Sequence, residues 1–132
     1  SDRISHNYRI NINIKISETK WVLGDETLLS WAFENVIKNS VDAIERGEGH
    51  IQIELNCIVN NKIQIDIIDS GKGIARKDRL NVFKPGFSSK KRGWGLGLSL
   101  TKRIIEELHH GRIFVLKSRP GETVIRTILN LK

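Results

Sequence analysis

Residues 25–44 constrain the fold more than any other stretch, because they have the period of one long amphipathic helix. Apolar and small side chains recur there at i, i+1, i+4 and i+5, which aligns them along one helix face. These positions are Leu28, Leu29, Ala32, Phe33, Val36, Ile37, Ser40, Val41 and Ile44. Asp25 is a suitable N-cap, and Gly47 and Gly49 are predicted to terminate the helix.

Alternating apolar residues predict strands on both sides of this helix. The stretches with this pattern are residues 8–16, 21–23, 51–57, 63–67, 113–116 and 124–131. The first of them has isoleucine at every second position from Ile10 to Ile16, which predicts a half-buried strand. Asn60 and Asn61 form a predicted hairpin turn, and a closing hairpin is predicted across residues 118–121.

Three further segments complete the predicted layout. A short helix is expected near residues 77–82, and a longer one over residues 96–108, ended by Gly111. Residues 83–97 lie between them without any period, and so long a loop in a compact domain is usually functional. The order of elements predicts an α+β fold, a two-layer α/β sandwich whose mixed, mostly antiparallel sheet packs on about three helices. We expect residues 1–132 to form one domain, and the lack of a regular βαβ alternation argues against a doubly wound fold.

The chain carries 22 Lys and Arg residues against 15 Asp and Glu. This net charge of +7 attracts anions such as nucleotide phosphates, nucleic acid or an acidic protein. Basic residues gather in the glycine-bearing loop, at Lys84, Lys90, Lys91 and Arg92. The sequence has no apolar run of roughly 20 residues and no secretory signal, and Cys57 has no second cysteine to pair with. We therefore expect a cytoplasmic domain, whose parent protein can still be attached to a membrane.

Asn35 and Asn39 lie four residues apart on the long predicted helix and so share one face. Their amide oxygens can bind a hard cation such as Mg²⁺, which prefers oxygen ligands and shares them with substrate phosphates. Asp42 follows nearby. A solvated polar face is the alternative, and it is the simpler interpretation of this helix taken alone. Asparagine is a poor helix former, however, so two of them in mid-helix call for an explanation.

Two glycine-bearing segments have the chemistry of a nucleotide site. Asp69 ends a strand, where it can accept a hydrogen bond from an exocyclic amine such as that of adenine, while Gly71 and Gly73 let a flat ring approach the backbone. A plain turn is the alternative. Residues 93–98 place glycines before a helix, where free backbone N–H groups and the helix dipole favour phosphate. A P-loop is excluded, because the sequence has no GxxxxGK[ST] motif.

Taken in order, four segments resemble the N, G1, F and G2 boxes of the GHKL superfamily, which groups gyrase, heat-shock and mismatch-repair ATPases with histidine kinases. The segments are residues 35–43 (NVIKNSVDA), 69–74 (DSGKGI), 83–90 (FKPGFSSK) and 93–100 (GWGLGLSL). The ATPase branch has a water-activating glutamate four residues before the N-box asparagine. This chain has Asn35 there, and Glu34 is displaced by about 100° around the helix. The chain is therefore most similar to the catalytic ATP-binding domain of sensor histidine kinases, which has the Bergerat fold.

The resemblance implies a role for each box. Asn39, helped by Asn35 and near Asp42, would hold Mg²⁺ on the ATP phosphates, and Asn39 and Lys90 would carry catalysis. Asp69 would bind the adenine amine. The other residues expected to contact ATP are Gly71, Gly73, Ile74, Phe83, Ser88, Ser89, Lys90, Gly93, Gly95, Leu96, Gly97 and Leu98, and residues 88–98 would form a lid.

The resemblance also implies partners. The γ-phosphoryl would pass to a histidine on a separate helical dimerisation domain of a two-component sensor kinase, and a response regulator receiver domain would follow. The histidines of this chain (His6, His50, His109 and His110) lack the sequence context of such an acceptor. We expect the domain alone to be monomeric and not to bind nucleic acid. The alternatives left open are a protein-serine kinase of the anti-sigma-factor type, a pseudokinase that binds nucleotide only to signal, and a non-catalytic nucleic-acid-binding module.

Overall fold

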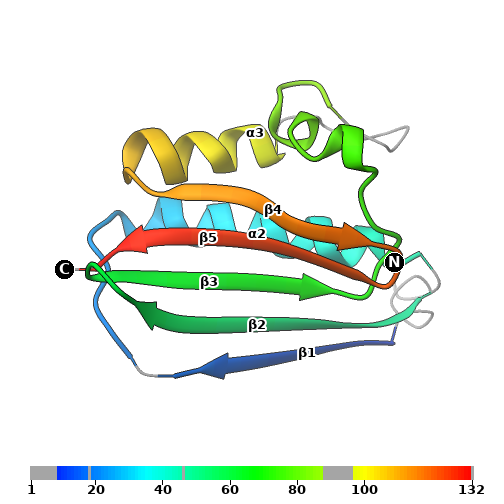
Figure 1. The fold of residues 1–132 in the computed structure, drawn as a ribbon, viewed down its shortest axis with the longest axis horizontal. Helices are drawn as coiled ribbons and strands as arrows, with labels where there is room; N and C mark the ends of the chain where they lie inside the picture. Colours follow the sequence, from blue (N-terminus) through cyan, green and yellow to red (C-terminus); the bar gives the residue numbers. More distant parts are fainter. Residues whose placement is uncertain (1–8, 18, 46, 88–96, 132) are drawn as a thin grey trace.

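The computed structural model describes residues 9–17, 19–45, 47–87 and 97–131, which form one sheet with helices against one of its faces (Figure 1). The strands are β1 (Arg9–Ile16), β2 (Glu48–Ile58), β3 (Lys62–Asp69), β4 (Arg112–Arg119) and β5 (Glu122–Asn130). The helical elements are α2 (Glu26–Ala43), α3 (Gly97–Lys102), the π-helix η3 (Arg103–Leu108), and the 3₁₀ turns η1 (Arg76–Asp78) and η2 (Asn81–Phe83). Within these described residues, no helix is both long and apolar enough to cross a membrane.

The sheet has the order β1-β2-β3-β5-β4, and only its β1–β2 pair is parallel. The chain reaches β2 from β1 through α2, while β2–β3 and β4–β5 are hairpins. Asn60 and Asn61 lie between the paired residues Ile58 and Lys62, and their φ angles of 64° and 58° are in the left-handed region that asparagine tolerates in turns. The predicted α+β sandwich and the predicted hairpin turn are confirmed.

Helix α2 begins at its predicted cap and ends earlier than predicted. The Asp25 carboxylate accepts a hydrogen bond from the Leu28 N–H at 3.0 Å. The helix ends at Ala43, and Gly47 follows in the left-handed conformation at φ 76°. The prediction that Gly49 ends the helix is wrong. It lies within β2, where an added Cβ would come within 2.7 Å of the Ser70 Oγ.

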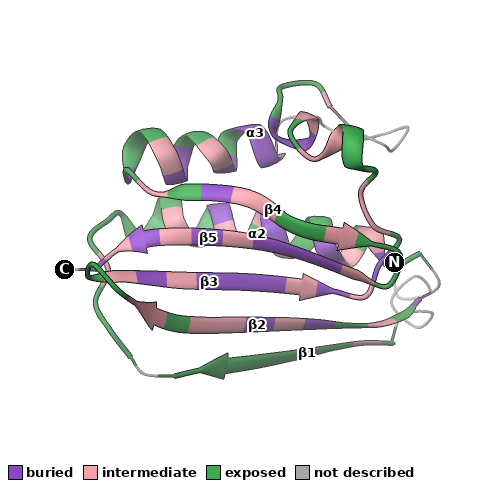
Figure 2. Cartoon of the chain, in the orientation of Figure 1, coloured by how far each residue is buried: buried purple, intermediate pink, exposed green. Residues whose placement is uncertain are grey.

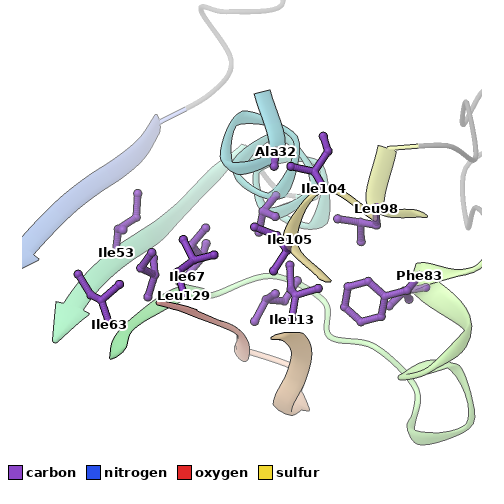
Figure 3. Packing of buried hydrophobic residues seen from close by; sticks show 14 of the residues in the cluster. Ala32, Ile53, Ile63, Ile67, Phe83, Leu98, Ile104, Ile105, Ile113 and Leu129 are labelled. Atoms are coloured by element: carbon purple, nitrogen blue, oxygen red, sulfur yellow. The ribbon is translucent and has the colours of Figure 1, made fainter. Parts of the chain in front are cut away.

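The hydrophobic core lies between the sheet and the helices (Figure 3). Ala32 and Val36 of α2 are fully buried, as is Ile105 of η3. The sheet contributes alternate residues to this layer, mostly isoleucine: Ile51, Ile53, Ile63, Ile65, Ile67, Ile113, Ile125 and Leu129. This alternation is the reason that the strands were readable from the sequence.

The prediction that β1 is half-buried is wrong. Ile12, Ile14 and Ile16 are 50%, 59% and 53% exposed, and Figure 2 shows β1 as an exposed border of the sheet. In the register, Ile12 lies beside Ile51, so the isoleucines face the same side as the core. Helix α2 packs over β3 and leaves that side of the edge strand uncovered. The alternating pattern identified the strand, but it could not tell whether a helix covers it.

Three other predicted elements differ in detail. Residues 21–23 form no strand, only an isolated bridge from Val22 to Leu131. The helix expected over residues 77–82 is replaced by the turns η1 and η2. The helix expected over residues 96–108 changes from α to π geometry at Arg103; Leu96 lies outside the described residues.

Gly111 follows this helix as predicted, although it is not the residue with a left-handed backbone. His110 has that conformation, at φ 56°. The Gly111 N–H donates a hydrogen bond to the Ile105 carbonyl at 2.8 Å. An added Cβ at Gly111 would come within 2.4 Å of the Ile128 carbonyl oxygen, so glycine is needed there because β5 passes close by.

Candidate functional site

Helix α2 carries both asparagines of the predicted cation site. The Asn35 side-chain amide N–H donates a hydrogen bond to the Trp31 carbonyl at 2.8 Å. This bond uses the amide nitrogen, and the amide oxygen is the atom that a cation would take as a ligand. Asn39 lies one turn further along the helix and is exposed, as is Asp42. The helix therefore presents amide oxygens at a surface that a phosphate-bound cation can reach.

Asp69 is the last residue of β3, and its side chain is buried, with 4% of its surface exposed. It shares the helix-facing side of the strand with Ile65 and Ile67. The Gly71 N–H donates a hydrogen bond to Asp69 Oδ1 at 2.8 Å. Burial raises the pKa of the Asp69 carboxyl, while the Gly71 N–H and the Ser40 hydroxyl act in the opposite direction. A buried carboxylate with one oxygen held in this way is suited to accept a hydrogen bond from a ligand.

The loop after Asp69 is held against the C-terminal end of α2. The Lys72 N–H donates to the Ala43 carbonyl at 2.9 Å, and the Lys72 ammonium lies 3.4 Å from the Glu45 carboxylate. A Cβ added at Gly71 would come within 2.6 Å of the Ala43 oxygen. The structure thus brings the carboxylate of β3 and the asparagine-bearing helix to one end of the fold.

The same loop is fastened on its other side to the β4–β5 hairpin. Gly73 has φ 89°, and an added Cβ there would come within 2.9 Å of the Arg119 oxygen. The Ile74 N–H donates to Ser118 Oγ at 2.7 Å, and the Gly121 N–H donates to the Gly71 carbonyl at 2.8 Å. In this structure the glycines permit close packing on both sides of the loop, an additional reason for their presence in the sequence.

Two predicted contact residues belong to the core. Phe83 is 7% exposed, with the Lys102 ammonium 5.3 Å from the centre of its ring, and Leu98 is 9% exposed in α3. Gly97 is the first residue of α3. The other predicted contacts, Ser88, Ser89, Lys90, Gly93, Gly95 and Leu96, lie outside the described residues.

Sequence reasoning missed one residue of this region. Ser40 was counted among the core positions of α2, and it is indeed buried, with 1% of its surface exposed. Its hydroxyl nevertheless acts on the Asp69 carboxyl by lowering its pKa. A small polar residue inside an otherwise apolar helix stripe was the signal that could have pointed to it.

A cavity of about 420 Å³ lies at the same end of the sheet. Its lining includes Asp69, Ser70 and His50 together with the β4–β5 turn. Neither Asn35 nor Asn39 lines it, so we do not assign this cavity to the phosphates or to a cation.

Comparison with known proteins identifies the class. Residues 24–132 match the family described as "Histidine kinase-, DNA gyrase B-, and HSP90-like ATPase". The chain belongs to this family of ATPase domains, which implies ATP binding. Within the family it is a catalytic domain of the sensor histidine kinases of two-component systems, as its relatives and solved neighbours indicate.

Those relatives are sensor kinases of bacteria. Sporulation kinase C of Bacillus subtilis is 30% identical over 132 residues, which is all of this chain and 30% of that protein. Sensor histidine kinase ZraS of Salmonella typhimurium is 34% identical over 120 residues, 90% of this chain and 25% of that protein. This chain therefore spans less than a third of the length of either relative.

The fold agrees with solved structures. The catalytic domain of histidine kinase ThkA superposes with a TM-score of 0.82 at 25% identity, over 98% of this chain and 83% of that one. ThkA has also been solved in complex with the response regulator TrrA. That chain matches with a TM-score of 0.75 at 23% identity, over 96% of this chain and 35% of that one. At this identity the second match shows the fold alone.

Proposed function

We propose that this domain binds ATP with Mg²⁺ between α2 and the loop after β3, and donates the γ-phosphoryl group to a histidine on a separate helical dimerisation domain. One observation carries the proposal. The Lys72 N–H bond to Ala43, together with the close fit of Gly71, holds the Asp69 carboxylate against the helix that bears Asn35 and Asn39. The adenine base at Asp69 and the phosphates near the asparagines of α2 can then belong to one bound nucleotide.

Each described residue has a distinct task in this proposal. The Asp69 carboxylate accepts a hydrogen bond from the adenine amine, while Gly71, Gly73 and Ile74 lie along the ring. Asn39, with Asn35 beside it, offers amide oxygens to Mg²⁺. Described residues hold no group of three or more His, Cys, Asp or Glu side chains that could chelate a metal alone, so a cation shared with the phosphates fits this donor set.

Residues outside the described part of the chain complete the proposal. We assign phosphate contacts to Ser88, Ser89 and Lys90 and to Gly93 and Gly95, with Leu96 beside them. The set continues into Gly97 and Leu98, which the structure describes as the start of α3. Glycines before a helix expose N–H groups to phosphate, and a lysine adds a charge-assisted hydrogen bond. This set would form the lid over the nucleotide.

Catalysis in this site consists of positioning and charge neutralisation. Bound Mg²⁺ would neutralise charge on the transferring group, whose transition state is loose and needs little covalent help. Asn35 stands where a water-activating glutamate would be needed, and an amide does not accept a proton at neutral pH. Transfer to a protein histidine is therefore favoured over hydrolysis.

The partners follow from the same proposal. The acceptor histidine would belong to a dimerisation domain in the same parent protein, and a receiver domain would take the phosphoryl group from it. ThkA was solved with a response regulator bound, which supports a partner of this kind. The net charge of +7 would favour association with acidic surfaces.

Titration calorimetry with a non-hydrolysable ATP analogue tests the binding step. We expect binding to the wild-type domain that strengthens when Mg²⁺ is added. Asn39→Ala should lose most of the Mg²⁺-dependent gain, whereas Asn56→Ala, an exposed asparagine in β2, should bind as the wild type does. If the wild-type domain does not bind at millimolar analogue, or if Asn39→Ala keeps the full Mg²⁺ effect, the assignment is wrong.

The transfer step needs a supplied acceptor. We expect label from γ-³²P-ATP to appear on a helical dimerisation domain of a related kinase mixed with this domain, and to be lost in acid, as phosphohistidine is. Acid-stable label would indicate the serine-kinase alternative. Nucleotide binding without any transfer to an acceptor from a close relative would favour the pseudokinase alternative.

A further inference from the structure

The Ser40 hydroxyl is a buried polar group that the proposed phosphoryl transfer does not use. Ser40 lies on the sheet-facing stripe of α2, four residues after Val36 and four before Ile44, all of them buried. Its Oγ is enclosed and makes no hydrogen bond of normal geometry with any residue that the structure describes. Buried hydroxyl groups are nearly always hydrogen-bonded, so this exception calls for a polar partner close to Ser40.

The Asp69 carboxylate is the group that this hydroxyl affects. Both side chains are almost completely buried, at 1% exposure for Ser40 and 4% for Asp69. Asp69 Oδ1 is already bound by the Gly71 N–H, and Gly71 packs against Ala43, three residues after Ser40 on α2. The Ser40 hydroxyl is close enough to lower the pKa of the Asp69 carboxyl, although the two do not form a hydrogen bond of normal geometry. Hydrogen bonds within a binding site can shorten when its ligand binds.

We propose that Ser40 is a positioning residue for base selection, whose hydroxyl donates to the Asp69 carboxylate and keeps it a hydrogen-bond acceptor when the purine binds. The inference rests on the proposed nucleotide function and names what determines its choice of base. An ionised carboxylate only accepts hydrogen bonds, so it matches the 6-amino group of adenine and repels the 6-oxo group of guanine. A protonated carboxyl can donate, and would match guanine instead.

Loss of the hydroxyl therefore has a specific signature. Burial raises the pKa of Asp69, and the Ser40 hydroxyl is one of two groups that oppose this rise. Without it, Asp69 protonates at higher pH in the folded domain. The binding of ATP should then weaken at a higher pH than in the wild type, and the preference for ATP over GTP should shrink.

The experiment measures, by calorimetry, the affinities of a non-hydrolysable ATP analogue and a non-hydrolysable GTP analogue from mildly acidic to mildly alkaline pH. In Ser40→Ala, we expect the acid limb, the part of the pH profile in which ATP affinity falls on acidification, to move to higher pH. The preference for ATP over GTP at neutral pH should fall about three- to tenfold, which is the effect of one hydrogen bond. Ser40→Cys keeps the volume and offers only a weak donor, so it should behave like Ser40→Ala. Ser40→Thr keeps the hydroxyl and should retain the wild-type limb and preference.

Ser30→Ala is the matched control, the same substitution at an exposed position of the same helix, and should change neither quantity. If Ser40→Cys keeps the wild-type acid limb and the wild-type preference, the inference is overturned while nucleotide binding stands. If the wild-type domain binds neither analogue at any pH, the proposed function itself fails, and this inference fails with it.

Discussion

Asp69 shows how a buried carboxylate can be unfavourable for folding and useful for binding. Its surface is 4% exposed, and burial raises its pKa from the ordinary value of an aspartate. Because the folded-state pKa is above the unfolded value, the folded chain holds the proton more tightly. The stability that this side chain contributes is therefore fully present in acid, below the unfolded pKa, and is lost as pH rises through the folded pKa.

Asp69→Asn removes this titration and should raise the melting temperature at neutral pH. The Gly71 N–H can still donate to the asparagine Oδ1, so the loop keeps its anchor. Thermal unfolding of both proteins across pH should give a difference close to zero in acid that grows with pH. The same variant should lose ATP binding in calorimetry, since an amide presents a donor as well as an acceptor. A melting temperature that falls at neutral pH would contradict the proposed role of burial.

His109 links the end of the helical layer to the start of α2. It is 8% exposed, accepts a hydrogen bond from the Asp25 N–H at Nε2 (2.9 Å), and has Nδ1 2.7 Å from the Ile104 carbonyl. The first bond needs an unprotonated Nε2, so Nδ1 carries the proton that is donated to Ile104.

Substitution of His109 by alanine should lower the free energy of unfolding by about 1–3 kcal/mol, because two hydrogen bonds and their packing are lost. Urea unfolding followed by circular dichroism measures this. His110→Asn, at the exposed left-handed neighbour, should stay within about 0.5 kcal/mol of the wild type, since asparagine tolerates that conformation. Equal losses in the two variants would argue against the bridging role of His109.

These three residues were not equally visible in the sequence. Asp69 could be found because it ends an alternating strand just before two glycines. Ser40 could not, because a small residue inside an apolar stripe is consistent with simple packing. The role of His109 depends on a partner 84 residues away, which no local pattern can reveal.

The loop between β3 and η1 is determined by sterics more than by backbone freedom. Gly71 has no left-handed φ, but an added Cβ would lie 2.6 Å from the Ala43 carbonyl oxygen. Gly121 is the opposite case, with φ 94° and open space where a Cβ would be. Glycine is therefore needed at position 71 for close packing and at position 121 for the backbone conformation.

Gly71→Ala should displace the loop from α2 and move the Asp69 carboxylate with it. We expect a loss of about 1–3 kcal/mol of stability from overpacking, together with at least tenfold weaker binding of the ATP analogue. Gly121→Ala should destabilise the domain by about 1–2 kcal/mol through backbone strain alone, with affinity close to that of the wild type. Similar affinities for both variants would show that the loop does not position Asp69.

Secondary structure was predictable where it depends on local pattern. The period of α2, its Asp25 cap and the Asn60-Asn61 turn are local, and each was read correctly. Residues 76–83 form two 3₁₀ turns because Phe83 and Val82 are drawn into the core, a tertiary effect. The change from α to π geometry at Arg103 likewise has no signal in the sequence that we recognise.

Among the residues that the structure describes, β1 forms an apolar border of the sheet that the described helices leave uncovered. Ile12, Ile14 and Ile16 of β1 are each at least half exposed on an edge strand. Exposed apolar edges favour association with other chains. The alternation of isoleucines shows which side chains share one face of the strand. It does not show whether a helix covers that face, and so the prediction of a buried face was wrong here.

Although we expect a monomer at ordinary concentration, edge strands can associate at high concentration. The double variant Ile12→Thr with Ile14→Thr should reduce such self-association of the isolated domain at little cost in stability. Threonine keeps a high strand propensity, and these side chains lose little burial, so we expect less than about 1 kcal/mol per site. Sedimentation velocity at high concentration measures association. Ile51→Thr, at a 1% exposed partner of Ile12, should instead destabilise the fold by about 2 kcal/mol or more. An unchanged sedimentation profile in the double variant, for a wild type that self-associates, would assign the association to another surface.

The position of β1 also determines how the sheet opens when the domain fluctuates. This strand is joined to a single neighbour, whereas β3 lies between β2 and β5. Backbone amides of β1 should therefore exchange with deuterium through small local openings, and those of β3 only through much larger ones. Protection should rise stepwise from the border inward, so that the domain can loosen at β1 while the end of β3 that carries Asp69 keeps its shape.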